Sequence, residues 1–232
     1  MRAALQCLLL SVLLAAQVVS ADDDVRYNQV NLDAQVSEKV SNDTMHVSLD
    51  SWGEHRDAAK LSEQINRDME WALSLAGQHA EVKASTGSYQ IWPLTTKDRT
   101  STRGWRGQQG LQLESRDSNA LSQLVGLLQD RLKMKSMHFA ISDERRETVE
   151  TRLIGLALEA FKARAQIVSS NLKADGYRIV NLHIGTSAQQ PPVMYKSRMA
   201  VASMEADSAV AVEAGESEVR VSVSGTIELV MP

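Results

Sequence analysis

The stretch that decides the fold runs from residue 143 to 171 and reads DERRETVETRLIGLALEAFKARAQIVSSN. Its apolar residues recur at the three- and four-residue spacing of an α-helix, which predicts one buried face on a long helix. The predicted stripe consists of Val149, Leu153, Leu156, Ala157, Ala160, Ala163, Ile167 and Val168. Ser142 precedes the helix as a candidate N-cap. Strand-like runs at 135–142 and 177–186 flank it, so we expect a helix lying on a sheet, with the rest of the chain packed around it.

The first 21 residues have the composition of a secretory signal peptide. Arg2 supplies a positive start, an apolar run spans residues 8–19, and Val19-Ser20-Ala21 resembles an A-x-A cleavage site. A membrane anchor requires about 17–25 apolar residues. This run is shorter, is broken by Gln17, and is closed by three aspartates. We therefore expect cleavage of residues 1–21 and export of a single domain, residues 22–232.

The composition excludes several classes of protein. The 232 residues are 43% hydrophobic and 23% charged, which is typical of a globular chain that can build one sizeable core. The only cysteine, Cys7, lies inside the predicted signal, so the mature chain offers no disulfide and no thiolate for catalysis or metal binding. The net charge is −4, and no basic stripe with interleaved aromatics indicates nucleic acid as a partner. No later segment is apolar enough to span a membrane.

Two alternating runs near the start, 30–37 and 44–49, are separated by Asn42-Asp43. Alternation of apolar and polar residues is typical of strands with one wet face, so this pattern predicts an antiparallel hairpin. The helical period of 55–77 then predicts a helix that covers the hairpin.

The remaining elements complete the order ββαββαβαββ. Two further strands are predicted at 80–94 and 105–116, and a short helix at 120–132. After the long helix, Val180, Leu182 and Ile184 are expected to face inward, and the closing strand alternates from residue 218 to 229. Because strands and helices do not alternate strictly, the fold class is α+β, with antiparallel sheets covered by helices and one long central helix.

The segment 187–213 follows no helix or strand pattern and predicts a mobile or functional connection. Met194, Met199 and Met204 recur in it every five residues. Thioethers can bind Cu(I) or take up oxidant as sulfoxide. Methionines in a loop more often pack on an apolar neighbour, which is the simpler explanation.

Five residues are candidates for contacts between copies of the chain. Val193, Tyr195, Met199 and Met204 are apolar side chains that no local pattern buries, so we expect them to pack on a neighbouring copy. Arg164 falls inside the apolar arc of the long helix. Its charge could serve an anionic ligand or a carboxylate of a neighbouring copy; alternatively, its stem packs on the stripe and its charged end reaches the helix edge.

No recognisable catalytic or metal-binding motif is present. The histidines have neither i, i+4 helical pairing nor a second ligand at metal-site spacing, and are expected to lie scattered on the surface: His46, His55, His79, His138 and His183. A nucleophile elbow, a phosphate loop and a dinucleotide fingerprint are all missing from the sequence. We therefore predict a protein that is not an enzyme and has no cofactor and no metal; a hydrolase with an unrecognised site is the least favoured hypothesis.

Four stretches carry a resemblance to a known family. They are Phe139-Ala140-Ile141-Ser142-Asp143, residues 157–165 (ALEAFKARA), residues 177–184 (YRIVNLHI) and Ala214-Gly215-Glu216. Together they resemble the SIMPL-domain family, an exported domain-of-unknown-function group that includes periplasmic immunogenic and oxidative-stress-defence proteins. The resemblance implies a periplasmic α+β protein that forms homo-oligomers, with a part in oxidative-stress tolerance and no established catalysis. The alternative function is a periplasmic binding module for a small ligand or metal.

Overall fold

The computed structural model describes residues 27–96, 101–189 and 214–232. The elements, in chain order, are β1 (Gln29–Ser41), β2 (Thr44–His55), α2 (Ala58–Ala76), β3 (Lys83–Thr95), β4 (Thr102–Ser115), α3 (Ser118–Leu128), β5 (Lys133–Ala140), α4 (Asp143–Asn171), β6 (Gly176–Gln189) and β7 (Glu216–Val230). This order confirms the α+β class and the ββαββαβαββ sequence of elements. The bounds of α4 are those predicted. β6 continues to Gln189, so the irregular segment predicted from residue 187 begins later than expected.

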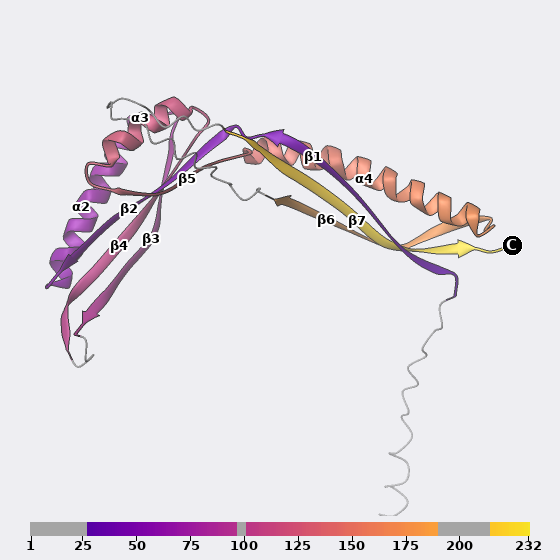
Figure 1. Ribbon diagram of the computed structural model, residues 1–232, viewed down its shortest axis with the longest axis horizontal. Helices are drawn as coiled ribbons and strands as arrows, with labels where there is room; N and C mark the ends of the chain where they lie inside the picture. The colour runs from indigo at the N-terminus through magenta and orange to yellow at the C-terminus, as the bar shows by residue number, and fades with distance from the viewer. Residues whose placement is uncertain (1–26, 97–100, 190–213) are drawn as a thin grey trace, which may run out of the picture.

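The strands form two antiparallel sheets (Figure 1). Sheet A has the order β1-β7-β6, and α4 runs along one of its faces. Sheet B has the order β3-β4-β2-β5, and α2 and α3 cover one of its faces. Each sheet has a hydrophobic cluster of its own. The expectation that the whole chain packs around the long helix is therefore wrong, because only sheet A lies against α4.

The predicted hairpin of the first two strands is also wrong. β1 pairs with β7 in sheet A, whereas β2 pairs with β4 and β5 in sheet B. Asn42 and Asp43 make no turn between paired strands. The backbone of Asn42 is hydrogen-bonded just before β7 of sheet A, and that of Asp43 is hydrogen-bonded to β5 of sheet B. The Asn42 N–H donates to the carbonyl of Gly215 at 3.1 Å, and the Asp43 N–H donates to the carbonyl of Ala140 at 3.1 Å. Alternation gave the two strands their faces correctly, but it carries no information about which strand is the partner.

Sheet B buries its core under α2 and α3. Asp57 caps α2 by accepting a hydrogen bond from the N–H of Ala59 at 2.8 Å. From there α2 buries Leu61, Ile65, Met69, Ala72 and Ala76. It packs on β2 and β4, not on the predicted hairpin. Gly107 of β4 permits this close approach, because a Cβ at that position would lie 2.8 Å from Cδ1 of Ile65.

The buried stripe of α4 differs from the predicted one. Its fully covered residues recur every four positions: Val149, Leu153, Ala157, Phe161, Ala165 and Ser169. Leu156 and Ile167 are 45% and 61% exposed, and Ala163 is exposed, so these three predictions are wrong. A four-residue repeat drifts by about 40° per step on an ideal helix, which lets the contact line follow a twisted sheet from Val149 to Ser169. A fixed helical wheel misses this drift and therefore missed Phe161.

The outer strand β6 is the second place where the structure differs from the predicted burial. The alternation of β7 is confirmed, since Val219, Val221 and Val223 are fully buried. Val180, Leu182 and Ile184 of β6 were expected inside but are 39%, 39% and 41% exposed. The side chains of β6 are exposed because α4 packs mainly on β7 and β1 and covers less of β6.

Candidate functional site

The exposed apolar strand β6 is the candidate site. Four large apolar side chains on it are between 39% and 43% exposed: Ile179, Val180, Leu182 and Ile184. Among residues 27–96, 101–189 and 214–232, β6 lies at the edge of sheet A, and its backbone pairs with β7 alone. We call these four residues and the free edge the β6 surface.

Most of the β6 surface continues the core face of sheet A. Cross-strand partners share a face, and Ile179 lies opposite Ile227 while Ile184 lies opposite Val223. Both β7 partners are fully buried against α4. The apolar face therefore extends past the cover of α4 to Ile179, Leu182 and Ile184. Val180 occupies a bulge where the register shifts by one residue.

The edge strands β3 and β5 carry prolines or lysines that discourage pairing with a further strand; past its bulge at Val180, β6 carries neither. β3 contains Pro93 and a register shift, and the edge strand β5 carries Lys133 and Lys135. Such prolines, lysines and bulges are the usual protection of exposed edges. From Ile179 to Gln189, β6 contains no charged residue and no proline. A long uncharged apolar edge is a template for another strand.

The edge of β1 is occupied by arginines from α4. Arg164 donates to the backbone carbonyl of Asp33, and its guanidinium lies 3.5 Å from the Asp33 carboxylate. Arg152 lies 2.6 Å from the carboxylate of Glu38. Arg164 thus reaches the edge of its own sheet, which agrees with the simpler of its two predicted roles. Of the other predicted assembly residues, Val193, Tyr195, Met199 and Met204, together with Met194, lie outside the described residues.

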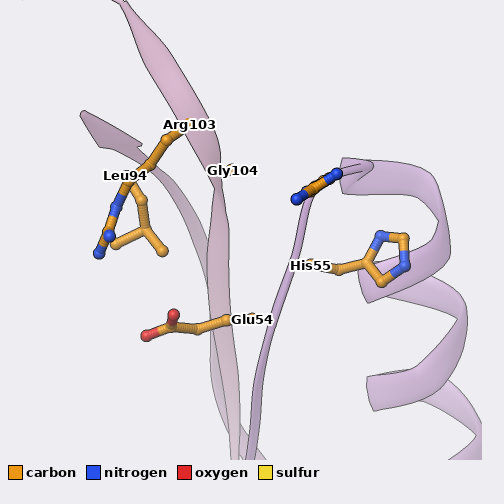
Figure 2. Close-up of a pocket in the computed structure, with 6 residues that line it drawn as sticks. Glu54, His55, Leu94, Arg103 and Gly104 are labelled. Carbon is orange, nitrogen blue, oxygen red and sulfur yellow. The ribbon is translucent and has the colours of Figure 1, made fainter. Parts of the chain in front are cut away.

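A hollow of about 460 Å³ lies at the far tip of sheet B. Figure 2 shows that Glu54 and His55 point in opposite directions from β2, with Arg103 on the side of Glu54. Glu54 accepts a hydrogen bond from Nε of Arg106 at 2.7 Å, and Nδ1 of His55 lies 2.9 Å from the N–H of Asp57. These polar groups hold the strand ends and the start of α2, and they do not converge on a common point.

A second hollow, of about 490 Å³, lies where β1, β2 and the start of α4 meet. Its arginines are each close to a carboxylate. Arg116 lies 2.9 Å from Glu144, and Arg145 lies 4.0 Å from Asp43. The hydrogen bond from Arg152 is the main cause that lowers the pKa of the Glu38 carboxyl. Each arginine of this hollow thus has a carboxylate partner, while Lys39, which also lines it, adds one further positive charge. The hollow is mainly a junction of ion pairs.

The histidines are not all scattered, contrary to the prediction. His46 of β2 lies directly opposite His138 of β5, and their rings are stacked with centroids 5.2 Å apart. Alternation placed each ring on a polar strand face, but the strand pairing that joins them could not be read from the sequence. Within residues 27–96, 101–189 and 214–232, no group of three or more His, Cys, Asp or Glu side chains is arranged to hold a metal ion.

With this geometry in place, the comparison with known families is decisive. The sequence model of the SIMPL family, described as a protein of unknown function (DUF541), matches residues 30–227. The chain belongs to the SIMPL family. The match spans both sheets and all three described helices, so the SIMPL domain comprises the two-sheet architecture as a whole. No curated protein matches the chain. Among the described helices of this SIMPL protein, none is long and apolar enough to cross a membrane.

Two solved structures show a partial likeness to this SIMPL chain. One is an amidase of the hydantoinase/carbamoylase family from Burkholderia multivorans, with 14% identity, a TM-score of 0.28, and coverage of 47% of this chain and 28% of that chain. The other is described as a candidate amidohydrolase/peptidase from Burkholderia cenocepacia, with 10% identity, a TM-score of 0.27, and coverage of 48% and 28%. The chain thus spans under a third of the length of each. Likeness at this level carries no argument about activity.

Proposed function

We propose that this SIMPL protein is a non-enzymatic periplasmic protein that assembles into homo-oligomers through the β6 surface, and that the assembly serves envelope or oxidative-stress tolerance. The observation that carries the proposal is the uncharged, half-exposed apolar edge of β6. An edge of this kind is normally blocked or covered, because it otherwise pairs with strands of other chains. A second copy of the chain is always present at equal concentration, so its β6 strand is the natural partner for this edge.

Two β6 strands can meet across a two-fold axis. An isologous contact places the same patch on both subunits, and an antiparallel strand pair has this symmetry. Pairing would satisfy the free backbone groups of both edges. It would also place Ile179, Leu182 and Ile184 of the two copies on one face of a continuous sheet, extending the core face of sheet A across the interface. Arg178 at the beginning of the strand lies outside the uncharged run.

The decisive experiment measures mass in solution by light scattering. Leu182→Lys combined with Ile184→Lys puts two charges on the β6 surface, and we expect the oligomer to fall to smaller species while the far-UV circular dichroism stays unchanged. Ile167→Lys is the matched control, because Ile167 is an apolar residue of α4 that is 61% exposed and does not belong to β6. We expect it to retain the wild-type mass.

Two outcomes would overturn the assembly proposal. One is a wild-type protein that is monomeric at micromolar concentration. The other is a double-lysine variant that stays folded and keeps the wild-type mass, since like charges brought together in a desolvated strand pair cannot be tolerated.

The periplasmic location is supported by the composition of residues 1–21 and by the resemblance to exported SIMPL proteins. The test is the intact mass of the protein recovered from the periplasmic fraction of a Gram-negative host. We expect a chain that begins at Asp22. Recovery from the membrane fraction with residues 1–21 still attached would contradict export by a cleaved signal. A deletion strain should lose viability under peroxide relative to its parent, which tests the stress role separately.

A further inference from the structure

The open face of sheet B brings two imidazoles together. His46 and His138 occupy opposed positions on β2 and β5, with ring centroids 5.2 Å apart and an angle of 12° between the ring planes. Met45 and Val47, the neighbours of His46 along β2, are buried in the core under α2 and α3. Because successive side chains of a strand point to opposite faces, both imidazoles lie on the face that these helices leave uncovered.

The ring nitrogens of the pair are not used elsewhere. In the described part of the chain, neither His46 nor His138 takes part in a hydrogen bond or an ion pair; the stacking contact is between the rings themselves. Other histidines differ in this respect, since Nδ1 of His79 lies 3.4 Å from the carboxylate of Glu81. Two half-buried imidazoles with uncommitted nitrogens are therefore side by side on a rigid sheet.

The surroundings keep the pair accessible and polar. His46 lines a hollow of about 480 Å³ together with Lys83, Gln112 and Glu114. Glu114 lies opposite His46 on β4, and its carboxylate accepts a hydrogen bond from Lys83 at 3.2 Å. Burial lowers the pKa of the His138 imidazole, and the adjacent His46 lowers it further.

We propose that His46 and His138 form a binding site for one borderline divalent transition-metal ion, such as Cu²⁺, Zn²⁺ or Ni²⁺, held by one nitrogen of each ring and completed by water. Imidazole is a favoured ligand for these ions. Metal–nitrogen bonds of about 2.1 Å place two ligating nitrogens roughly 3.4 to 4.2 Å apart. Because the rings are stacked nearly parallel, both side chains must rotate so that one nitrogen of each ring points at the ion. With two protein ligands, the site should exchange its ion rather than retain it permanently.

The site does not depend on assembly through β6, because His46 and His138 belong to the other sheet. The probe is CuCl₂ added to the full mature chain, since Cu²⁺ binds most tightly to a given set of nitrogen ligands. We expect one equivalent to bind by titration calorimetry, and we expect the electron paramagnetic resonance spectrum to show hyperfine coupling to two imidazole nitrogens.

Matched variants separate this site from other copper binding. His46→Asn and His138→Asn should each lower the apparent affinity at least about tenfold, because even changes outside the ligand shell cost about 10- to 100-fold. His183→Asn and His79→Asn should leave the affinity unchanged. In the wild type, paramagnetic Cu²⁺ should broaden the NMR signals of His46 and His138 before those of His183, a measurement that needs no variant. Binding that persists in both pair variants, or broadening that begins at another histidine, would overturn the proposal.

Discussion

The carboxylate of Asp43 accepts two hydrogen bonds from Ser142, one from the backbone N–H at 2.6 Å and one from the hydroxyl at 2.9 Å. Asp43 begins the passage into β2, and Ser142 is the residue before α4. The hydroxyl of Ser142 thus binds Asp43 and makes no capping hydrogen bond to α4, although Ser142 holds the N-cap position. The pair ties the start of sheet B to the start of the helix on sheet A.

The first prediction is that Asp43→Asn destabilises the protein in a pH-dependent way. Burial alone would raise the pKa of Asp43, but the hydrogen bonds from Ser142 and Thr44 and the charge of Arg145 outweigh it, so the pKa lies below its ordinary value of 3.8. A depressed carboxyl pKa contributes stability that is present above the unfolded-state value and is lost as the pH falls through the folded-state value. We expect a loss of about 1–3 kcal/mol at pH 7, shrinking below pH 3.8.

The measurement is thermal unfolding of wild type and Asp43→Asn between pH 7 and strongly acidic pH. Asp130→Asn is the control, because Asp130 is exposed in the turn after α3. A gap between the Asp43 variant and the wild type that stays constant into acid would contradict a role for the ionised carboxylate.

The second prediction compares two residues of α4. Phe161 is fully buried between the helix and sheet A, so Phe161→Ala should cost about 3–5 kcal/mol. Leu156 is 45% exposed, and Leu156→Ala should change stability by no more than about 1 kcal/mol. Urea denaturation of the two variants checks both values. Equal losses would mean that the contact line of α4 is the one read from a fixed helical wheel.

The third prediction concerns Gly225 of β7, which lies beside the bulge of β6. A Cβ at this position would collide with the backbone oxygen of Asn181 and lie 2.9 Å from Cδ2 of Leu182. A backbone atom cannot yield without moving the strand, so Gly225→Ala should cost at least about 1–3 kcal/mol. It should also weaken the protection of β6 amides in hydrogen exchange.

Gly155→Ala is the matched control for Gly225→Ala. Nothing lies within 4 Å of a Cβ added to Gly155 on α4. Alanine is the better helix former, so this variant should gain up to about 1 kcal/mol. Loss of stability in both variants would point to a general intolerance of alanine rather than to the collision at the bulge.

The fourth prediction tests the segment that leaves β6. Its residues 190–213 include the predicted assembly candidates, and replacing Pro191 to Ala211 by a short Gly/Ser linker removes them. If they pack on a neighbouring copy, light scattering should report a smaller particle with the fold retained. An unchanged mass would leave the β6 surface as the sole assembly element proposed.

Replacing Met194, Met199 and Met204 together by Leu should leave Cu(I) affinity unchanged, since we expect these residues to serve packing.

The sequence predicted the number, type and order of the elements because each is governed by local periodicity. The faces of β1, β2 and β7 followed from alternation of period two, and the ends of α4 followed from its flanking polar residues. These features depend on residues a few positions apart. Strand partners depend on residues far apart, which explains why β1 and β2 were wrongly joined in one hairpin.

The candidate sites were missed for the same reason. Leu182 and Ile184 have the pattern of buried residues, and only the position of α4 over β7 and β1 leaves them exposed. Likewise, 92 positions separate His46 from His138 in the chain, and only the pairing of β2 with β5 brings them together. The uncharged composition of residues 179–189 was the one signal in the sequence that could have indicated an unprotected edge.

The hydrogen bond between Ser142 and Asp43 joins two residues that are 99 positions apart in the chain. The segment that forms sheet B therefore begins and ends at the same place in the fold. Everything from β2 to β5 is thus an insertion whose two ends touch, interrupting a smaller unit made of β1, α4, β6 and β7. For that outer unit, a folded insertion behaves as a short link rather than as a long flexible loop, which lowers the entropy cost of bringing β1 to β7. Pairings between distant strands are the slow steps of folding. The order of events should therefore run from the middle of the chain outward, with the ends of the protein joining last.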